Sequence, residues 1–248
     1  MGRKEEYLAS LQRIKEWIPY LKANSNLPGP RGNLELAYAA AEAASIGQME
    51  EMLGADGPDV QENSPEVFVV FCGIVAMGAL CNLDDPEAFD RLKRYANDPR
   101  WRIREAVAMA LQGIGRRNMR LLLDEMLSWL DGSYCVLRAV AAGLCEPELL
   151  KDENGAAKVL DILDQITIHY QEGPASDKEG YEVLKKGLSY CWSVAATANL
   201  PYGKRLMEKW ISSGHTGVRK IMQENLKKNR LIRLEKDWVE ECLIILAQ

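Results

Sequence analysis

The stretch "NDPRWRIREAVAMALQGIG", residues 97–115, decides the fold because it reads as the beginning, body and end of one helix. Asp98 is expected to cap the helix and Pro99 to occupy its first turn, where a missing N–H costs nothing. Gly113 and Gly115 are expected to loosen the helix and end it. Its buried face, at helical spacing, is expected to carry Ile103, Val107, Ala110, Leu111 and Ile114.

The same pattern recurs along the chain. "IREAVAMAL" at 103–111 resembles "VRKIMQENL" at 218–226, and "VLRAVAAGL" at 136–144 is similar with its Arg one place later. Helices of this kind are expected to begin near residues 33, 66, 100, 132, 181 and 215. One helix pair cannot bury its own apolar face, so several must stack. The sequence therefore predicts an all-α fold, an α-solenoid of about five or six antiparallel helix pairs.

The recurring pattern resembles the HEAT repeat, whose proteins belong to the armadillo-like α-solenoids. The likeness lies in Asp-Pro, then an apolar-Arg pair at a helix start, then Ala-rich periodicity, and it covers residues 85–146 and 200–230. The signatures of tetratricopeptide and ankyrin repeats are absent from the sequence. The spacing of the helix starts is shorter than the usual repeat of about 40–47 residues, so some units are expected to be trimmed.

We expect a single domain over residues 1–248. Its N-terminal part, 1–32, is predicted to hold one amphipathic helix and a turn, and residues 33–248 to hold the repeats, with a polar insert near 171–180. Residues 67–83 form an apolar run of about 17 residues, the lower limit for crossing a membrane. Its Gly and Ala content favours a buried helix, so no membrane is expected.

Composition excludes several classes of function. The formal net charge is -5, so no global basic field for nucleic acid exists, although a local basic stripe remains compatible with it. The six cysteines form no CxxC pair and sit mostly in apolar helical runs, which indicates buried free thiols in a reducing, cytoplasmic setting. No metal ligand set, cofactor motif or catalytic template is present, so neither metal nor cofactor is expected and the catalytic residues are unknown.

Three arginines recur at the start of the second helices, which line the concave face of such a solenoid: Arg104, Arg138 and Arg219. One interpretation is a structural ladder in which each pairs with a carboxylate, for which Asp98 and Asp131 are available. The other is a row of guanidinium groups aimed at phosphates or carboxylates.

Two tryptophans and one basic segment complete the candidate binding surface. Trp101 and Trp192 fall on or near second helices, where an aromatic ring either fills the gap between repeats or stacks on a ligand. Lys220 belongs to "RKIMQENLKKNRLIRLEK", residues 219–236, the one dense basic stretch in this acidic protein. That stretch is either a solvated helix face or an edge that contacts phosphates.

Two functions remain open. The first is a non-enzymatic scaffold that binds a protein or peptide in its groove. The second follows from a resemblance, in "RWRIRE" and "VRKIMQENLKKNRL", to the alkylpurine DNA glycosylases of the AlkC and AlkD kind, which use HEAT-like repeats. That resemblance implies binding of duplex DNA and a catalytic carboxylate. The position of this carboxylate in the chain is not assigned; Asp98 and Glu105 lie near the matching stretch. The oligomeric state is not predicted.

Overall fold

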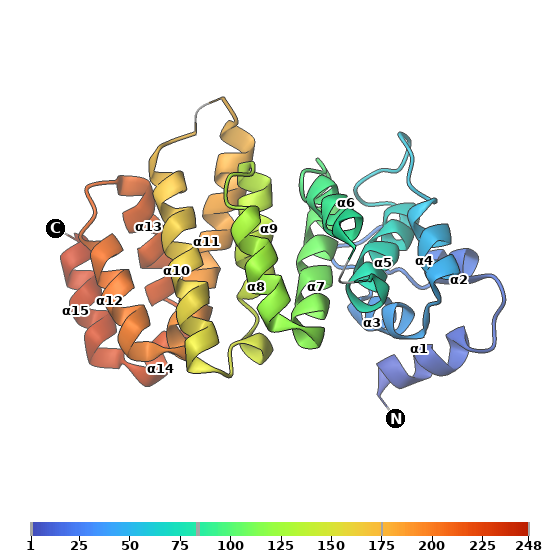
Figure 1. The fold of residues 1–248 in the computed structure, drawn as a ribbon, viewed down its shortest axis with the longest axis horizontal. Helices are drawn as coiled ribbons and strands as arrows, with labels where there is room; N and C mark the ends of the chain where they lie inside the picture. The colour runs from blue at the N-terminus through green and yellow to red at the C-terminus, as the bar shows by residue number, and fades with distance from the viewer. Residues whose placement is uncertain (1, 83–84, 175, 248) are drawn as a thin grey trace. The chain divides into compact units, whose positions relative to one another are not determined.

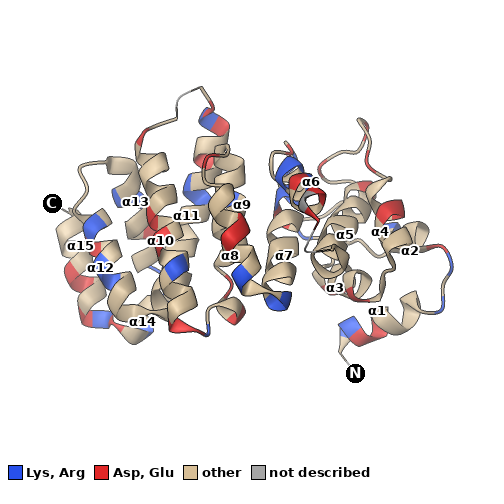
Figure 2. Cartoon of the chain, viewed as in Figure 1, with Lys and Arg blue, Asp and Glu red and all other residues tan. Residues whose placement is uncertain are grey.

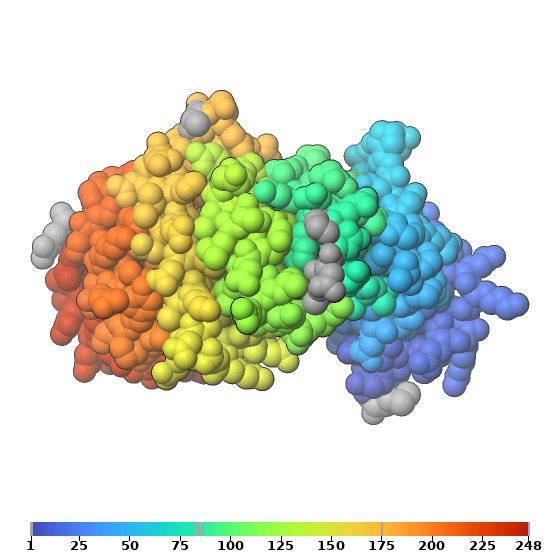
Figure 3. All heavy atoms as spheres, in the orientation of Figure 1, coloured from blue at the N-terminus to red at the C-terminus, as the bar shows by residue number. Residues whose placement is uncertain are grey.

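A computed structural model describes residues 2–82, 85–174 and 176–247; the remaining positions are drawn grey in Figures 1 and 3. Over this part of the chain the structure holds fifteen α-helices, one short 3-10 helix and no strand. The predicted all-α fold class is thus confirmed. The chain divides into two compact units, unit 1 (Met1–Asn118) and unit 2 (Met119–Gln248), each described by itself. That the two act as a single domain stays a prediction.

Unit 1 contains the first seven helices in chain order (Figure 1). They are α1 (Arg3–Leu11), α2 (Trp17–Ala23), α3 (Leu34–Ala43), α4 (Ile46–Leu53), α5 (Pro65–Leu80), α6 (Pro86–Ala96) and α7 (Trp101–Arg117).

Unit 2 contains the other eight α-helices and the 3-10 helix η1 (Pro147–Leu149). They are α8 (Met119–Ser128), α9 (Tyr134–Leu144), α10 (Glu153–Gln171), α11 (Lys178–Ala198), α12 (Leu200–Ile211), α13 (Thr216–Leu226), α14 (Asn229–Leu234) and α15 (Lys236–Ala247).

The predicted second helices of the repeats exist and form the centre of each unit. We call α3, α5 and α7 the inner helices of unit 1, and α9, α11 and α13 those of unit 2. Each begins within three residues of its predicted start. Within each unit they pack on one another in chain order, and α4, α6, α10 and α12 each pack on the inner helix that follows. This stacking buries the apolar faces that one helix pair would leave exposed.

Helix α5 is the core of unit 1. It contacts α2, α3, α4 and α7, and its residues from Val67 to Gly78 are all buried. A helix that is apolar on every side must be covered on every side. The apolar run is therefore a buried helix, as predicted; it ends at Leu80, and position 83 of the run lies outside the described residues. No helix in the described ranges has the length and apolar character needed to cross a membrane.

The helix starts predicted near residues 33, 66 and 100 are each right to within one residue, but the roles predicted for Asp98 and Pro99 at α7 are wrong. The Asn33 side chain accepts a hydrogen bond from the Leu36 N–H, and Ser64 caps α5 with Pro65 in the first turn. Helix α7, however, begins at Trp101, and Asp98 and Pro99 precede it. The Asp98 carboxylate accepts instead from the backbone N–H of Arg100 at 2.8 Å, two residues along, so it forms a turn before the helix.

Two further expectations are corrected. Helix α7 passes through Gly113 and Gly115 and ends at Arg117, because Gly113 serves a close helix contact rather than a helix end. The N-terminal segment forms two helices, α1 and α2, where one was predicted. Pro19 explains the break, because a proline inside a continuous helix removes one hydrogen bond and its ring clashes with the carbonyl four residues earlier.

The predicted polar insert lies between α10 and α11 in unit 2. Helix α10 ends at Gln171 and α11 begins at Lys178; position 175 of the insert lies outside the described residues. Gly173 has a φ of 95°, a conformation that glycine adopts without strain. The long interval between the starts of the inner helices α9 and α11 comes from this loop and from the 19 residues of α10.

Candidate functional site

One hollow of unit 1 is a groove that crosses its inner helices. It has a volume of about 610 Å³ and is open on one side. The residues that line it are Lys4, Tyr38, Ala41, Glu42, Val75, Ala79, Met109, Gly113, Arg116 and Arg117. They come from α1, α3, α5 and α7, so the groove lies on the face that the stacked inner helices share.

The floor of the groove is apolar because α5 and α7 approach each other very closely. A Cβ atom at Gly78 would lie 2.3 Å from the Ala110 carbonyl oxygen, and one at Gly113 would lie 3.3 Å from the Gly78 carbonyl. Backbone therefore packs on backbone at this crossing. Beside it the floor is completed by Val75 and Met109, which are buried, and by Ala79, which is exposed.

The two sides of the groove differ in their charged residues. On the α1 and α3 side, Lys4 Nζ and Glu42 Oε2 lie 2.5 Å apart, so the two charges cancel. On the α7 side stand Arg116 and Arg117, both exposed, in the last helical turn. Figure 2 shows blue, the colour of Lys and Arg, at the lower end of α7. Arg117 Nη1 donates to the Cys81 carbonyl at 3.0 Å and to the Gly78 carbonyl at 3.4 Å, so it binds this part of the backbone.

The arginines at the start of α7 hold loops and turns. Arg100 makes two ion pairs: its guanidinium reaches Asp56 at 2.8 Å and Asp98 at 2.7 Å. These hydrogen bonds raise the pKa of Arg100, with Asp98 contributing most. Arg104 Nη1 donates to the backbone carbonyls of Asp98 and Pro99, at 2.6 and 2.7 Å. Arg104 thus binds the main chain of Asp98, and its pairing with a carboxylate stays a prediction.

Arg102, which the sequence analysis did not single out, joins three segments. It is 7% exposed, and it donates to the Gly29 carbonyl at 2.8 Å, to Asn63 Oδ1 at 3.0 Å and to the Glu62 carbonyl at 3.1 Å. Its guanidinium carbon also lies 4.6 Å from the ring centroid of Trp101. Trp101 is 48% exposed, so of the two candidate tryptophans it is the one that a ligand can reach.

The candidates in unit 2 have structural contacts. Trp192 is fully buried, and its Nε1 donates to Thr167 Oγ1 at 3.1 Å, so it fills the core. Arg219 Nη2 donates to the Ile245 and Leu246 carbonyls at the end of α15. Half-buried Arg138 lies against Gly187 of α11, and its pairing with Asp131 stays a prediction.

Lys220 is exposed on α13. Together with Trp101, it is one of the two candidates that project into solvent, and the two belong to different units. Of the six candidates, Trp101 and Arg104 belong to unit 1, and the other four, Arg138, Trp192, Arg219 and Lys220, belong to unit 2.

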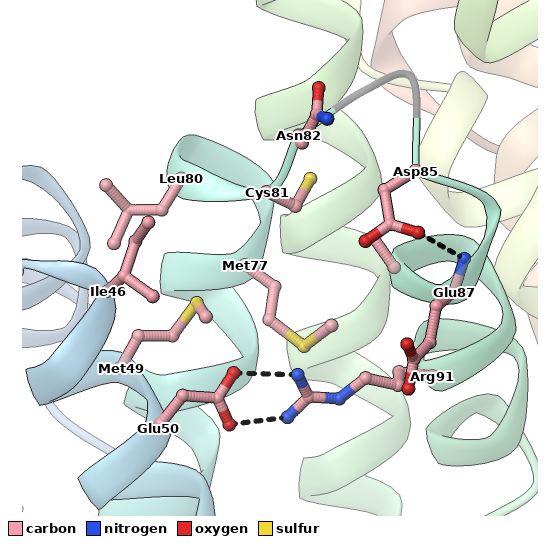
Figure 4. A pocket seen from close by; sticks show the side chains of 11 residues that line it. Ile46, Met49, Glu50, Met77, Leu80, Cys81, Asn82, Asp85, Glu87 and Arg91 are labelled. Carbon is pink, nitrogen blue, oxygen red and sulfur yellow. Dashed lines mark hydrogen bonds and ion pairs between the residues drawn. The ribbon is translucent and has the colours of Figure 1, made fainter.

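A second pocket in unit 1, of about 260 Å³, lies between α4, α6 and the end of α5 (Figure 4). Glu50 and Arg91 form a two-bond ion pair beside it, at 2.7 and 2.9 Å. Its apolar lining includes Met49, Met77 and Cys81. Burial raises the pKa of the Cys81 thiol, although Arg117 opposes that shift, so the thiol is neutral near pH 7 and a weak nucleophile.

Metal ligands do not gather in the described part of the chain: no three His, Cys, Asp or Glu residues there lie close enough to hold an ion. His215 instead caps α13, its Nδ1 accepting from the Val218 N–H at 3.2 Å.

Comparison with known proteins gives no family and no function for the chain. No family model, curated protein or solved structure matches the chain. The groove of unit 1 is therefore the best candidate site on structural grounds. The sequence analysis missed Arg116 and Arg117; the signal was the basic pair in "GIGRRN", at the end of a glycine-containing inner helix.

Proposed function

We propose that the chain is a non-enzymatic, HEAT-like scaffold, and that the groove of unit 1 binds a segment of a partner protein. The observation that carries this proposal is the groove itself: an apolar floor that crosses three inner helices and stays open to solvent. An exposed apolar surface rimmed by polar residues is typical of protein interaction sites.

The polar groups of the groove fit binding better than catalysis. Glu42 is the one carboxylate among the described residues of the lining, and it is exposed and paired with Lys4. A general acid or base must exchange a proton with the bound substrate. The Glu42 carboxylate is instead held in an ion pair with Lys4 at the edge of the groove. The cytoplasm remains the proposed location, because all six cysteines are free thiols.

Duplex DNA is the second candidate, and the basic stretch at residues 219–236 is what favours it. The contacts weigh against it: Arg104 and Arg219 donate to main-chain carbonyls, and Trp192 is buried. We expect a labelled duplex to show no binding at physiological salt. Measurable binding that falls steeply with salt, and that Lys220→Ala weakens without loss of stability, would favour the DNA-binding function instead.

The scaffold proposal is tested by filling the groove. Ala79 is exposed on α5, so Ala79→Trp places a large ring over the floor while the protein stays folded. Ala23→Trp, at an exposed position on α2, is the matched control. A displayed library of random peptides is selected on the wild-type protein, and each enriched peptide is then measured on all three proteins.

We expect the enriched peptides to bind the wild-type and Ala23→Trp proteins alike and to lose at least about tenfold in affinity on Ala79→Trp, the cost of a blocked central contact. Peptides that bind Ala79→Trp equally well, or a selection that enriches none, would show that the groove is not a peptide site.

A further inference from the structure

The inner helices of unit 2 have an exposed face that carries unpaired positive charge. Helices α11 and α13 pack on each other, and α10 and α12, which also pack on each other, contact both. The exposed positions of α11 include Lys186 and Tyr190, and those of α13 include Thr216 and Lys220, each pair four residues apart and so on one side of its helix. These side chains therefore lie on the face directed away from α10 and α12. The side chains of Lys186 and Lys220 have no ion-pair partner in the described ranges.

Arg230 of α14 adds a third positive charge beside Tyr190. Its guanidinium carbon lies 4.5 Å from the centroid of the Tyr190 ring, and its Nη2 donates to the Tyr190 hydroxyl at 2.7 Å. Its Nη1 is buried and has no hydrogen-bond partner among the residues that the structure describes. A neutral hydroxyl does not cancel the charge of a guanidinium group. We call Lys186, Lys220 and Arg230 the basic face of unit 2.

The carboxylates of the same helices do not neutralise the basic face. Helices α9, α11, α13 and α14 contain three acidic residues, Glu179, Glu182 and Glu224. Glu182 pairs with Lys185 at 3.2 Å, and Glu224 pairs with Lys227 at 2.6 Å. Glu179 lies in the first turn of α11, where the helix dipole favours a negative charge. The positive charge of the face is therefore available to an acidic ligand.

We infer that the basic face of unit 2 binds a short acidic segment of a partner protein. Lys and Arg bind carboxylates through charge-assisted hydrogen bonds, and a positive surface attracts a negative one. A nucleic acid fits this face less well, because the net charge of the chain is -5 and opposes a long polyanion. A base would also need a bare aromatic ring on which to stack, and Arg230 already covers one side of Tyr190. The inference goes beyond the groove, which belongs to unit 1.

The experiment tests this face with the groove blocked. A displayed library of random peptides is selected on Ala79→Trp at low salt, where exposed charges attract most strongly. The affinity of each enriched peptide is then measured on Ala79→Trp alone and combined with Lys186→Gln, Lys220→Gln or Lys158→Gln. Lys158 is the matched control, because it is exposed on α10, which covers the opposite side of α11. Circular dichroism checks that each variant is folded.

We expect the enriched peptides to be rich in Asp and Glu. Lys186→Gln and Lys220→Gln should each weaken binding by about two- to fivefold, the range of an exposed charge pair, and added salt should weaken it further. Lys158→Gln should leave the affinity unchanged. A selection that enriches no peptide, or peptides that ignore both substitutions, would overturn the inference, whatever the unblocked groove binds. Labelled single-stranded DNA that binds more tightly than the peptides, and that both substitutions weaken, would assign the face to nucleic acid instead.

Discussion

Single residues of the same type have different roles in this fold. Arg100, Arg102 and Arg104 stand at alternate positions in one short stretch, yet the first pairs with two aspartates, the second joins α7 to two loop segments and the third donates to the backbone before its own helix. Each partner depends on what the neighbouring loop presents at hydrogen-bond distance.

Asn225 is the clearest case of a buried polar residue that fixes two helices. It is fully buried; its Oδ1 accepts from the Ser193 N–H, and its Nδ2 donates to the Leu188 and Ile221 carbonyls, each at 2.8 Å. Asn225→Ala leaves buried groups of α11 without these partners, so we expect a loss of about 2–4 kcal/mol in the free energy of unfolding. Urea unfolding measures it, with exposed Asn229→Ala as a control expected to stay within about 0.5 kcal/mol. Equal losses in both variants would contradict this role.

The cysteines are expected to differ in reactivity. Five of the six are buried, and Cys135 is half-buried. Burial raises the pKa of the Cys72 and Cys145 thiols and raises that of Cys242 to about 11. Since only the thiolate reacts, Ellman's reagent near pH 8 should modify Cys135 first in the native protein and all six after denaturation. Rapid native reaction that persists in Cys135→Ser would show that a second thiol is accessible.

Among whole elements, α5 and α7 show how small residues set a helix crossing. Gly78→Ala would raise helix propensity by about 1 kcal/mol, but the new Cβ would lie 2.3 Å from the Ala110 carbonyl oxygen. Backbone cannot move away as a side-chain tip can, so we expect a net loss of about 1–3 kcal/mol. Gly47→Ala, on the exposed surface of α4, should instead be neutral or stabilising. Thermal unfolding of both variants gives the comparison, and a stabilised Gly78→Ala would mean that the helices lie further apart.

The Glu50–Arg91 pair joins α4 to α6 and gives unit 1 a pH dependence. Hydrogen bonding from Arg91 lowers the pKa of Glu50 below 4.5 in the folded state. A lowered carboxyl pKa stabilises the protein above the unfolded pKa, and that stability is lost as the pH falls through the folded value. The effect should stay below about 1 kcal/mol, because Glu50 is half exposed.

We therefore expect Glu50→Gln to be less stable than the wild-type protein near pH 6, and the difference to shrink toward about pH 3. Urea unfolding across this range measures it. Glu51→Gln, on the same helix and exposed, is the control. A difference between the wild-type and Glu50→Gln proteins that does not change with pH would show that the ion pair does not contribute to stability.

At the scale of the whole molecule, the structure divides into two compact units. Each unit holds three stacked inner helices, the minimum number at which repeats of this kind become stable. We expect fragments 1–118 and 119–248, cut at the unit boundary, each to fold on its own. Circular dichroism with urea titration should show two helical fragments with cooperative unfolding. A fragment that is unfolded alone would instead support one cooperative domain.

The sequence by itself determined the helical architecture. Helix starts follow from local rules, since Asn33 and Ser64 cap with their own side chains and the apolar spacing of each inner helix is written in consecutive residues. The break before α2 and the continuation of α7 through Gly113 were missed, because Pro19 was not weighed and Gly113 matters only where another backbone touches it.

The tertiary structure alone decided the candidate site. The groove joins side chains from Lys4 to Arg117, and no local pattern brings residues so far apart in the chain to one surface. It also decided that Trp192 is core and that Trp101 is exposed, although both have the same ring and both lie on inner helices. Burial depends on which helix packs against the residue, and that packing is fixed by long-range contacts.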